Sequence, residues 1–207
     1  MHGAEICGQY LNDEDLAAQI ANDQFTAREL FTFEFICDAI NSVFPGHCNE
    51  IIVSLVKMIT FDALTGNNDR HFYNWGIISD KKKTGKMPKF APLYDSSRGL
   101  LWNMSDESIV DFQNALKSNG KKIIKYIENS SPRISIEGNS SINHFDLIGF
   151  LKKHKVEYKV LIEELSSAEN ENLVINMLKS DFYPFFIRER SELITTIIRE
   201  RFKRVRE

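Results

Sequence analysis

Cysteine is scarce in this sequence of 207 residues, and its spacing is irregular. The three cysteines, Cys7, Cys37 and Cys48, contain no Cys-x-x-Cys pair, and their number is odd. This pattern disfavours both a disulfide framework and a structural zinc site. We therefore expect three buried or neutral thiols in a reducing cytosol.

Long apolar runs and a strong charge of one sign are also missing. No run of about 18 apolar residues occurs, so the sequence predicts no membrane-spanning helix. The start, Met1 to Glu5, has no basic region followed by an apolar run and does not resemble a secretory signal. A net charge of −3 indicates neither a nucleic-acid nor a membrane partner. We expect a soluble, cytoplasmic protein with no membrane contact and no direct nucleic-acid binding.

Hydrophobic residues are plentiful, at 43%, and their spacing is mostly helical. A helix from Leu30 to Val43 is expected after a capping box at Thr26–Glu29, and Phe31, Phe33 and Phe35 would cover both of its faces. Some of these rings should therefore meet another surface. Other helices are predicted after the acidic run at residues 12–15 and at Glu50–Leu64, Asp106–Lys117, Lys121–Asn129, His144–His154, Val156–Leu165, Asn170–Lys179 and Pro184–Arg206.

The helix at Glu50–Leu64 is apolar on most sides, which predicts a central place in the core. Gly66 should end it in the left-handed conformation. Beyond it, Trp75–Ile78 and Lys89–Tyr94 read as two short strands around a basic turn with Lys81, Lys82, Lys83 and Lys86. A mobile polar loop is expected near residues 130–141. The predicted fold is thus mainly α, one domain over 1–207, with a single β-hairpin.

The polar residues around this hairpin carry the most information. Asp69 is a potential general base, Asn74 offers an amide oxygen five residues later, and Asp95 follows the returning strand. A hairpin is the simplest way to bring positions 74 and 95 close together. Carboxylate and amide oxygens suit Mg²⁺, which is held by one or two such groups plus phosphates. Asp-x4-Asn, a hairpin and then Asp is also the order of the catalytic groups in protein kinases.

The segments Thr65–Gly76 and Ala91–Leu100 together resemble the C-terminal domain of HipA-like serine/threonine kinases. The resemblance implies a kinase C-lobe that transfers the ATP γ-phosphate to a Ser or Thr hydroxyl. By resemblance, Asp69 would be the catalytic base, and Asn74 and Asp95 would be Mg²⁺ ligands. His71 and Tyr94 would lie against the nucleotide phosphates. The implied cofactors are Mg²⁺ and ATP.

The sequence departs from the kinase pattern before Asp62. Only 61 residues precede it, they read as helices, and neither Gly-x-Gly-x-x-Gly nor Val-Ala-x-Lys occurs. The phosphate-binding N-lobe is therefore expected to be absent, and the start near Met1 favours a truncated C-lobe. The implied partners are an N-lobe from the same gene or from a separate chain, a protein substrate and a DNA-binding antitoxin, since HipA-like kinases are often toxins.

Two other functions stay open on the sequence. A kinase-derived module that binds a partner without chemistry would fit the missing glycine loop and lysine. A metal-dependent phosphohydrolase could use the same carboxylates but would need more acidic ligands than Asp69 and Asp95. Each of these residues could instead have a purely structural role. Asp69 could cap a helix or turn, Asn74 and Asp95 could be turn residues, and His71 could be a hydrogen-bonded structural residue.

Overall fold

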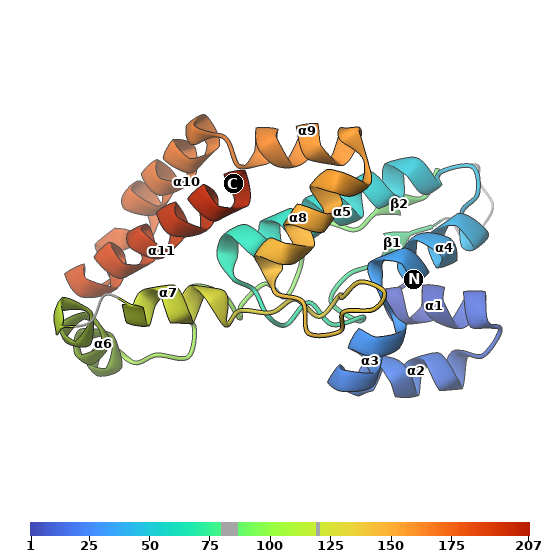
Figure 1. Ribbon diagram of the computed structural model, residues 1–207, viewed down its shortest axis with the longest axis horizontal. Helices are drawn as coiled ribbons and strands as arrows, with labels where there is room; N and C mark the ends of the chain where they lie inside the picture. Colours follow the sequence, from blue (N-terminus) through green and yellow to red (C-terminus); the bar gives the residue numbers. More distant parts are fainter. Residues whose placement is uncertain (80–86, 119–120) are drawn as a thin grey trace. The chain divides into compact units, whose positions relative to one another are not determined.

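The computed structural model describes residues 1–79, 87–118 and 121–207, which are mainly helical (Figure 1). Their contacts divide into two compact units. Unit 1 comprises Met1–Ile59, Asn68–Ser96 and Pro132–Ile142, and unit 2 comprises Thr60–Asn67, Ser97–Ser131 and Asn143–Glu207. The single C-lobe domain over 1–207 stays a prediction. Within the described ranges, no helix combines the length and the apolar character needed to cross a membrane.

Unit 1 is mainly helical. Its helices are α1 (Gly3–Leu11), α2 (Glu14–Asn22), α3 (Gln24–Leu30), α4 (Phe33–Val43) and most of α5 (Cys48–Thr65). The predicted capping box at Thr26 is wrong, because the Asp23 carboxylate caps α3 by accepting the Thr26 N–H at 2.8 Å. Thr32 caps α4, so the helix expected to run unbroken into Val43 is interrupted between α3 and α4.

Because the helix is interrupted here, aromatic side chains point into the core of unit 1. Phe31, at the C-cap of α3, is 1% exposed, and Phe33 is fully buried. The Phe31 ring centre lies 5.1 Å from that of Phe35 and 5.0 Å from that of Phe72. The expectation that some of these rings meet another surface is met within unit 1, which buries Phe31 and Phe33.

Helix α5 confirms the predicted apolar helix and leads into the candidate site. Residues buried along it include Ile51, Leu55, Val56, Met58 and Ala63. Gly66 ends it with φ +71°, as predicted. The N–H groups of Gly66 and Asn67 both donate to the Asp62 carbonyl, at 2.8 and 3.0 Å. These two bonds close the C-terminal end of α5.

The predicted hairpin is present in unit 1. Strand β1 (Ile77–Ile78) pairs antiparallel with β2 (Lys89–Phe90), with Ile77 opposite Phe90. The pairing continues past the strands, because the Ala91 N–H donates to the Gly76 carbonyl at 2.8 Å. The basic turn predicted at Lys81–Lys83 and Lys86 lies outside the described residues.

The opposite edge of β1 is occupied by the N-terminal residues. The Met1 carbonyl accepts the Ile77 N–H at 2.8 Å, and the Met1 ammonium donates to the Ile77 carbonyl at 2.9 Å. Gly76 allows this approach, since a Cβ at position 76 would collide with the Met1 carbonyl oxygen. Strand β1 is therefore paired on both sides.

Unit 2 contains the remaining helices. They are α6 (Asp106–Ser118), α7 (Lys121–Glu128), α8 (His144–His154), α9 (Val156–Leu165), α10 (Ala168–Asp181), the 3-10 helix η1 (Tyr183–Phe185) and α11 (Arg188–Arg206). These confirm the predicted helices except the last, which does not start at Pro184. Pro184 lies in η1, and α11 begins at Arg188. An apolar stripe buried along α11 includes Leu193, Ile197, Ile198, Phe202 and Val205.

Arg201 is a buried cation inside this unit, with 1% exposure. Its Nε donates to the Ala63 carbonyl at 2.6 Å, at the end of α5. Its Nη1 donates to the Ser130 hydroxyl at 2.9 Å and the Ile127 carbonyl at 3.3 Å. Burial lowers the pKa of Arg201 to about 10. The side chain remains charged at neutral pH and joins three separate stretches of unit 2.

Two leucines in the Ser97–Ser131 stretch of unit 2 adopt left-handed backbone conformations. Leu100 has φ +49° and Leu101 has φ +67°, at a cost of about 1–2 kcal/mol each for a bulky residue. The Leu101 side chain is fully buried, and its N–H donates to the Tyr126 hydroxyl at 3.1 Å. Leu100 is only half-buried. Burial therefore offsets the strain more completely at position 101 than at position 100.

We predict that Leu100→Gly changes the free energy of unfolding by less than about 1 kcal/mol, because relief of strain offsets lost burial and the added entropy of the unfolded chain. Leu101→Gly should cost about 2 kcal/mol or more, because it removes a fully buried side chain. Urea unfolding followed by circular dichroism measures both values. Equal losses for the two variants would contradict the argument that the greater burial of Leu101 separates them.

Candidate functional site

The loop after α5 is folded tightly around one carbonyl group. The Asp69 carbonyl accepts the His71 N–H at 2.8 Å and the Asn74 side-chain Nδ2–H at 2.8 Å. The Asn74 N–H in turn donates to the His71 carbonyl at 2.8 Å. These bonds place Asp69 and Asn74, which are five positions apart, on the same small loop of unit 1.

Arg70 joins this loop to the end of the hairpin. Its side chain is buried, with 2% exposure. Its Nη1 donates to the Asn74 carbonyl at 2.9 Å and to the Tyr94 carbonyl at 2.5 Å, and its Nη2 donates to the Ser96 hydroxyl at 2.7 Å. Because one nitrogen holds both carbonyls, the backbone of Asn74 lies beside that of Tyr94. The structure thereby brings the segment of Asp95 to the loop of Asp69 and Asn74.

Asn74 and Asp95 carry oxygen atoms of the kind that a hard divalent cation prefers. The Asn74 amide is 4% exposed, and its nitrogen is used by the Asp69 carbonyl, so Oδ1 is the atom that it can offer a ligand. Asp95 is exposed and has φ +48°, a conformation that aspartate tolerates better than most residues. Mg²⁺ binds about six oxygens, so phosphate oxygens and water would complete its coordination. Within the described ranges, no group of three or more His, Cys, Asp or Glu residues suits a metal ion.

The Asp69 carboxylate has a partner that sequence reasoning missed. The Arg133 Nη2 donates to Asp69 Oδ1 at 2.9 Å, and its Nε donates to the Asn68 carbonyl at 3.1 Å. The two side chains are 13% exposed for Asp69 and 19% for Arg133. They are 64 positions apart, with no local pattern to connect them. The polar composition near Arg133 indicated only a mobile loop.

Residues Pro132–Ile142, here called the clamped segment, are held to unit 1 rather than left as a loose loop. The buried Arg28 guanidinium donates to the carbonyls of Ser140 at 2.6 Å, Ile142 at 2.7 Å and Pro132. The Ser135 hydroxyl donates back to the Arg28 carbonyl, and its own carbonyl accepts the Phe33 N–H at 2.8 Å. The expectation of a mobile loop is wrong, because Arg28 supplies donors to backbone acceptors at both ends of the segment.

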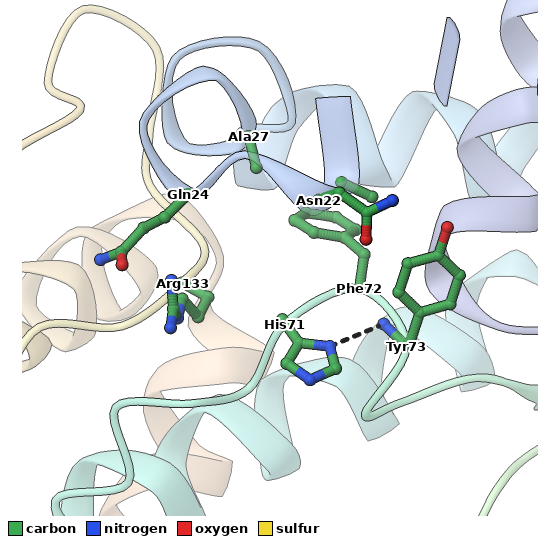
Figure 2. Close-up of a pocket in the computed structure, with 8 residues that line it drawn as sticks. Asn22, Gln24, Ala27, His71, Phe72, Tyr73 and Arg133 are labelled. Atoms are coloured by element: carbon green, nitrogen blue, oxygen red, sulfur yellow. Dashed lines mark hydrogen bonds between the residues drawn. The ribbon is translucent and has the colours of Figure 1, made fainter. Parts of the chain in front are cut away.

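His71 and Tyr94 line two different pockets. His71 faces a pocket of about 150 Å³ together with Asn22, Gln24 and Arg133 (Figure 2). Its Nδ1 accepts the Tyr73 N–H at 3.2 Å, which fixes the orientation of the ring. The nucleotide contacts of His71 and Tyr94 stay predictions.

Tyr94 lines a second pocket, of about 310 Å³, with Met1, His2 and Ile77. Its hydroxyl donates to the Tyr73 carbonyl at 3.0 Å and lies 3.0 Å from His2 Nδ1. Partial burial raises the pKa of the Tyr94 phenol; the nearby Arg70 charge opposes that increase. The phenol is therefore a neutral hydrogen-bonding group at physiological pH.

Comparisons with known proteins identify the fold. No protein-family model and no curated protein matches the chain. Among solved structures, it is similar to the crystal structure of a Helicobacter pylori proinflammatory kinase, CtkA, with a TM-score of 0.72 and 16% sequence identity. The similarity covers all of this chain and 66% of that kinase, so the chain spans just under two thirds of its length. At this level of identity the likeness concerns the fold, and the chain has a kinase-like fold.

Proposed function

We propose that this chain is the C-lobe of a HipA-like protein kinase, which transfers the γ-phosphate of ATP to a serine or threonine hydroxyl in the presence of Mg²⁺. One observation carries the proposal: the Arg70 guanidinium holds the Asn74 loop against the backbone that leads into Asp95. This arrangement agrees with the kinase order of a base, an amide ligand and a carboxylate ligand. The kinase-like fold supports it independently.

In this proposal, Asp69 accepts the hydroxyl proton of the phosphoacceptor and orients its oxygen. Asn74 Oδ1 and the Asp95 carboxylate hold the divalent cation. Bound Mg²⁺ would neutralise charge on the ATP phosphates. The chain's own contribution is mainly positioning, since phosphoryl transfer needs little covalent assistance. Tyr94 and His71 are proposed to contact the nucleotide, Tyr94 from the pocket that it shares with Met1 and Ile77.

The proposal includes partners. An N-lobe, from the same gene or from another chain, would supply the glycine loop and lysine that this sequence lacks. A protein would be the substrate, and a DNA-binding antitoxin is proposed as a regulator if the kinase is a toxin. The same missing elements favour one alternative, a kinase-derived module that binds a partner without catalysis.

Calorimetric titration with ATP, in the presence and absence of Mg²⁺, tests the proposal in the assembly that contains an N-lobe. Asp95→Asn should weaken Mg²⁺-ATP binding at least about tenfold, which corresponds to about 1.4 kcal/mol, because it removes an anionic ligand. Binding of ATP without Mg²⁺ should change much less. Asp111→Asn, on the exposed side of α6, is the matched control. Equal Mg²⁺-ATP affinities for the wild type and Asp95→Asn would overturn the proposed metal site.

A further inference from the structure

The Arg133 guanidinium donates hydrogen bonds to two adjacent residues at the start of the candidate catalytic loop. Its Nε–H and Nη2–H lie along one edge of the planar group and reach the Asn68 carbonyl and Asp69 Oδ1, respectively. Two donors in a fixed geometry restrict both the backbone before Asp69 and the rotation of its carboxylate. A lysine ammonium, which is a point charge on a flexible chain, cannot reproduce this two-point contact.

Arg133 is itself held in place by the clamped segment. Pro132, the residue before it, gives its carbonyl to Arg28 Nη1, and Ser140 and Ile142 give theirs to the other nitrogens of the same guanidinium. Burial and the nearby Arg133 charge lower the pKa of Arg28. Two cations therefore lie near each other in unit 1, and Arg28 contacts backbone carbonyls while Arg133 contacts the Asp69 carboxylate.

We propose that Arg133 is a positioning residue for Asp69, delivered to the candidate base by the clamped segment; the catalytic part of this inference rests on the proposed kinase function. Arg133 also lines the pocket that contains His71, Asn22 and Gln24 (Figure 2). A carboxylate that Arg133 already holds in one orientation needs no rearrangement before it accepts the phosphoacceptor proton. Such preorganisation acts on the rate of the chemical step more than on nucleotide binding.

The test uses the full chain, in its N-lobe-containing assembly, with [γ-³²P]ATP and casein as a general protein acceptor. Arg133→Gln should lower kcat by about 10- to 100-fold with little change in the KM for ATP, because the carboxylate loses its fixed orientation. Arg133→Lys should recover part of this loss, since it keeps the charge but not the two-point contact. Arg188→Gln, which removes an exposed ion pair with Glu192 on α11, is the matched control.

A second readout does not depend on turnover. In ¹³C-labelled protein, the side-chain carboxyl resonance of Asp69, assigned by its loss in Asp69→Asn, should move in Arg133→Gln and stay in place in Arg188→Gln. An unmoved Asp69 resonance, or an unchanged kcat for Arg133→Gln in an enzyme that requires Asp69, would overturn the inference. If the wild type transfers no phosphate while the resonance still moves, the proposed function fails and the coupling between Arg133 and Asp69 stands.

The clamp is tested by combining substitutions. Arg28→Lys should lower kcat in the same direction as Arg133→Gln, and the double variant should lose little more than Arg133→Gln alone, because both act through the position of Arg133. Fully additive losses would show that the clamp and Arg133 act separately. If Arg28→Lys does not fold, Ser135→Ala replaces it, since it removes only the hydroxyl that donates to the Arg28 carbonyl.

Discussion

Replacing Asp69 by asparagine should lower the rate of phosphate transfer by about 10³-fold while the protein keeps its fold. Asparagine has the same shape, and the Asp69 carbonyl that accepts the bonds from His71 and Asn74 is unchanged. The amide cannot take up the hydroxyl proton, so the base catalysis is lost. Initial rates with [γ-³²P]ATP and casein measure the effect, and circular dichroism checks the fold.

The same substitution should also cost some stability. The Arg133 side chain, 19% exposed, would lose its anionic partner and keep only uncharged acceptors, the Asn68 carbonyl and the amide oxygen of the new side chain. We expect a loss of about 1 kcal/mol, since the pair is only partly buried and solvent screens it. Asp111→Asn is again the control. A phosphate-transfer rate within about threefold of the wild type would exclude Asp69 as the base.

Replacing Arg201 by methionine should lower the free energy of unfolding by about 3 kcal/mol. The substitution removes a costly buried charge, but it leaves the Ala63 carbonyl and the Ser130 hydroxyl without their donor. An unsatisfied buried polar group costs about 1–3 kcal/mol, so the losses exceed the gain. Urea unfolding measures the effect. Arg199→Met, on the same helix, is the matched control. A stability equal to the wild type would show that these contacts contribute nothing net.

Because the pKa of Arg201 is lowered, its contribution to the free energy of unfolding should depend on pH. With a pKa of about 10 in the folded state, well below the ordinary value of an arginine, the folded protein releases this proton at a lower pH than the unfolded chain does. The unfolded state binds more protons between these two values, so the Arg201 contribution makes stability rise with pH there. Below about pH 9, Arg201 is charged in both states and adds no pH dependence. Arg201→Met should remove the alkaline effect.

Local patterns in the sequence predicted much of the fold and part of the candidate site. Apolar periodicity predicted α5 and most helices of unit 2. Gly66 indicated the end of α5, because glycine readily adopts the left-handed conformation that ends a helix. The order of Asp69, Asn74 and Asp95 around a hairpin was also visible. The break between α3 and α4 was not predicted. Asp23 and Thr32 each cap a separate helix, but the apolar spacing continues across both helices and therefore indicated a single one.

The partners of the candidate site could not be predicted in the same way. Arg133 reaches Asp69 across 64 positions, and Arg28 reaches Ser140 across 112. Neither residue belongs to a local sequence motif that would predict its contacts. The acceptors of Arg28 are backbone carbonyls, which every residue carries. Long-range contacts of this kind depend on the tertiary fold, and only the three-dimensional structure supplies them.

The chemistry of the Arg28 contacts predicts how the clamped segment responds to solution conditions. Its three acceptors are uncharged, so acid that protonates carboxylates leaves them intact, and salt screens them weakly. The contact between Arg133 and Asp69 joins opposite charges and is sensitive to both. Raising the ionic strength should therefore weaken the ion pair between Arg133 and Asp69, while the hydrogen bonds from Arg28 keep the backbone of the clamped segment in place.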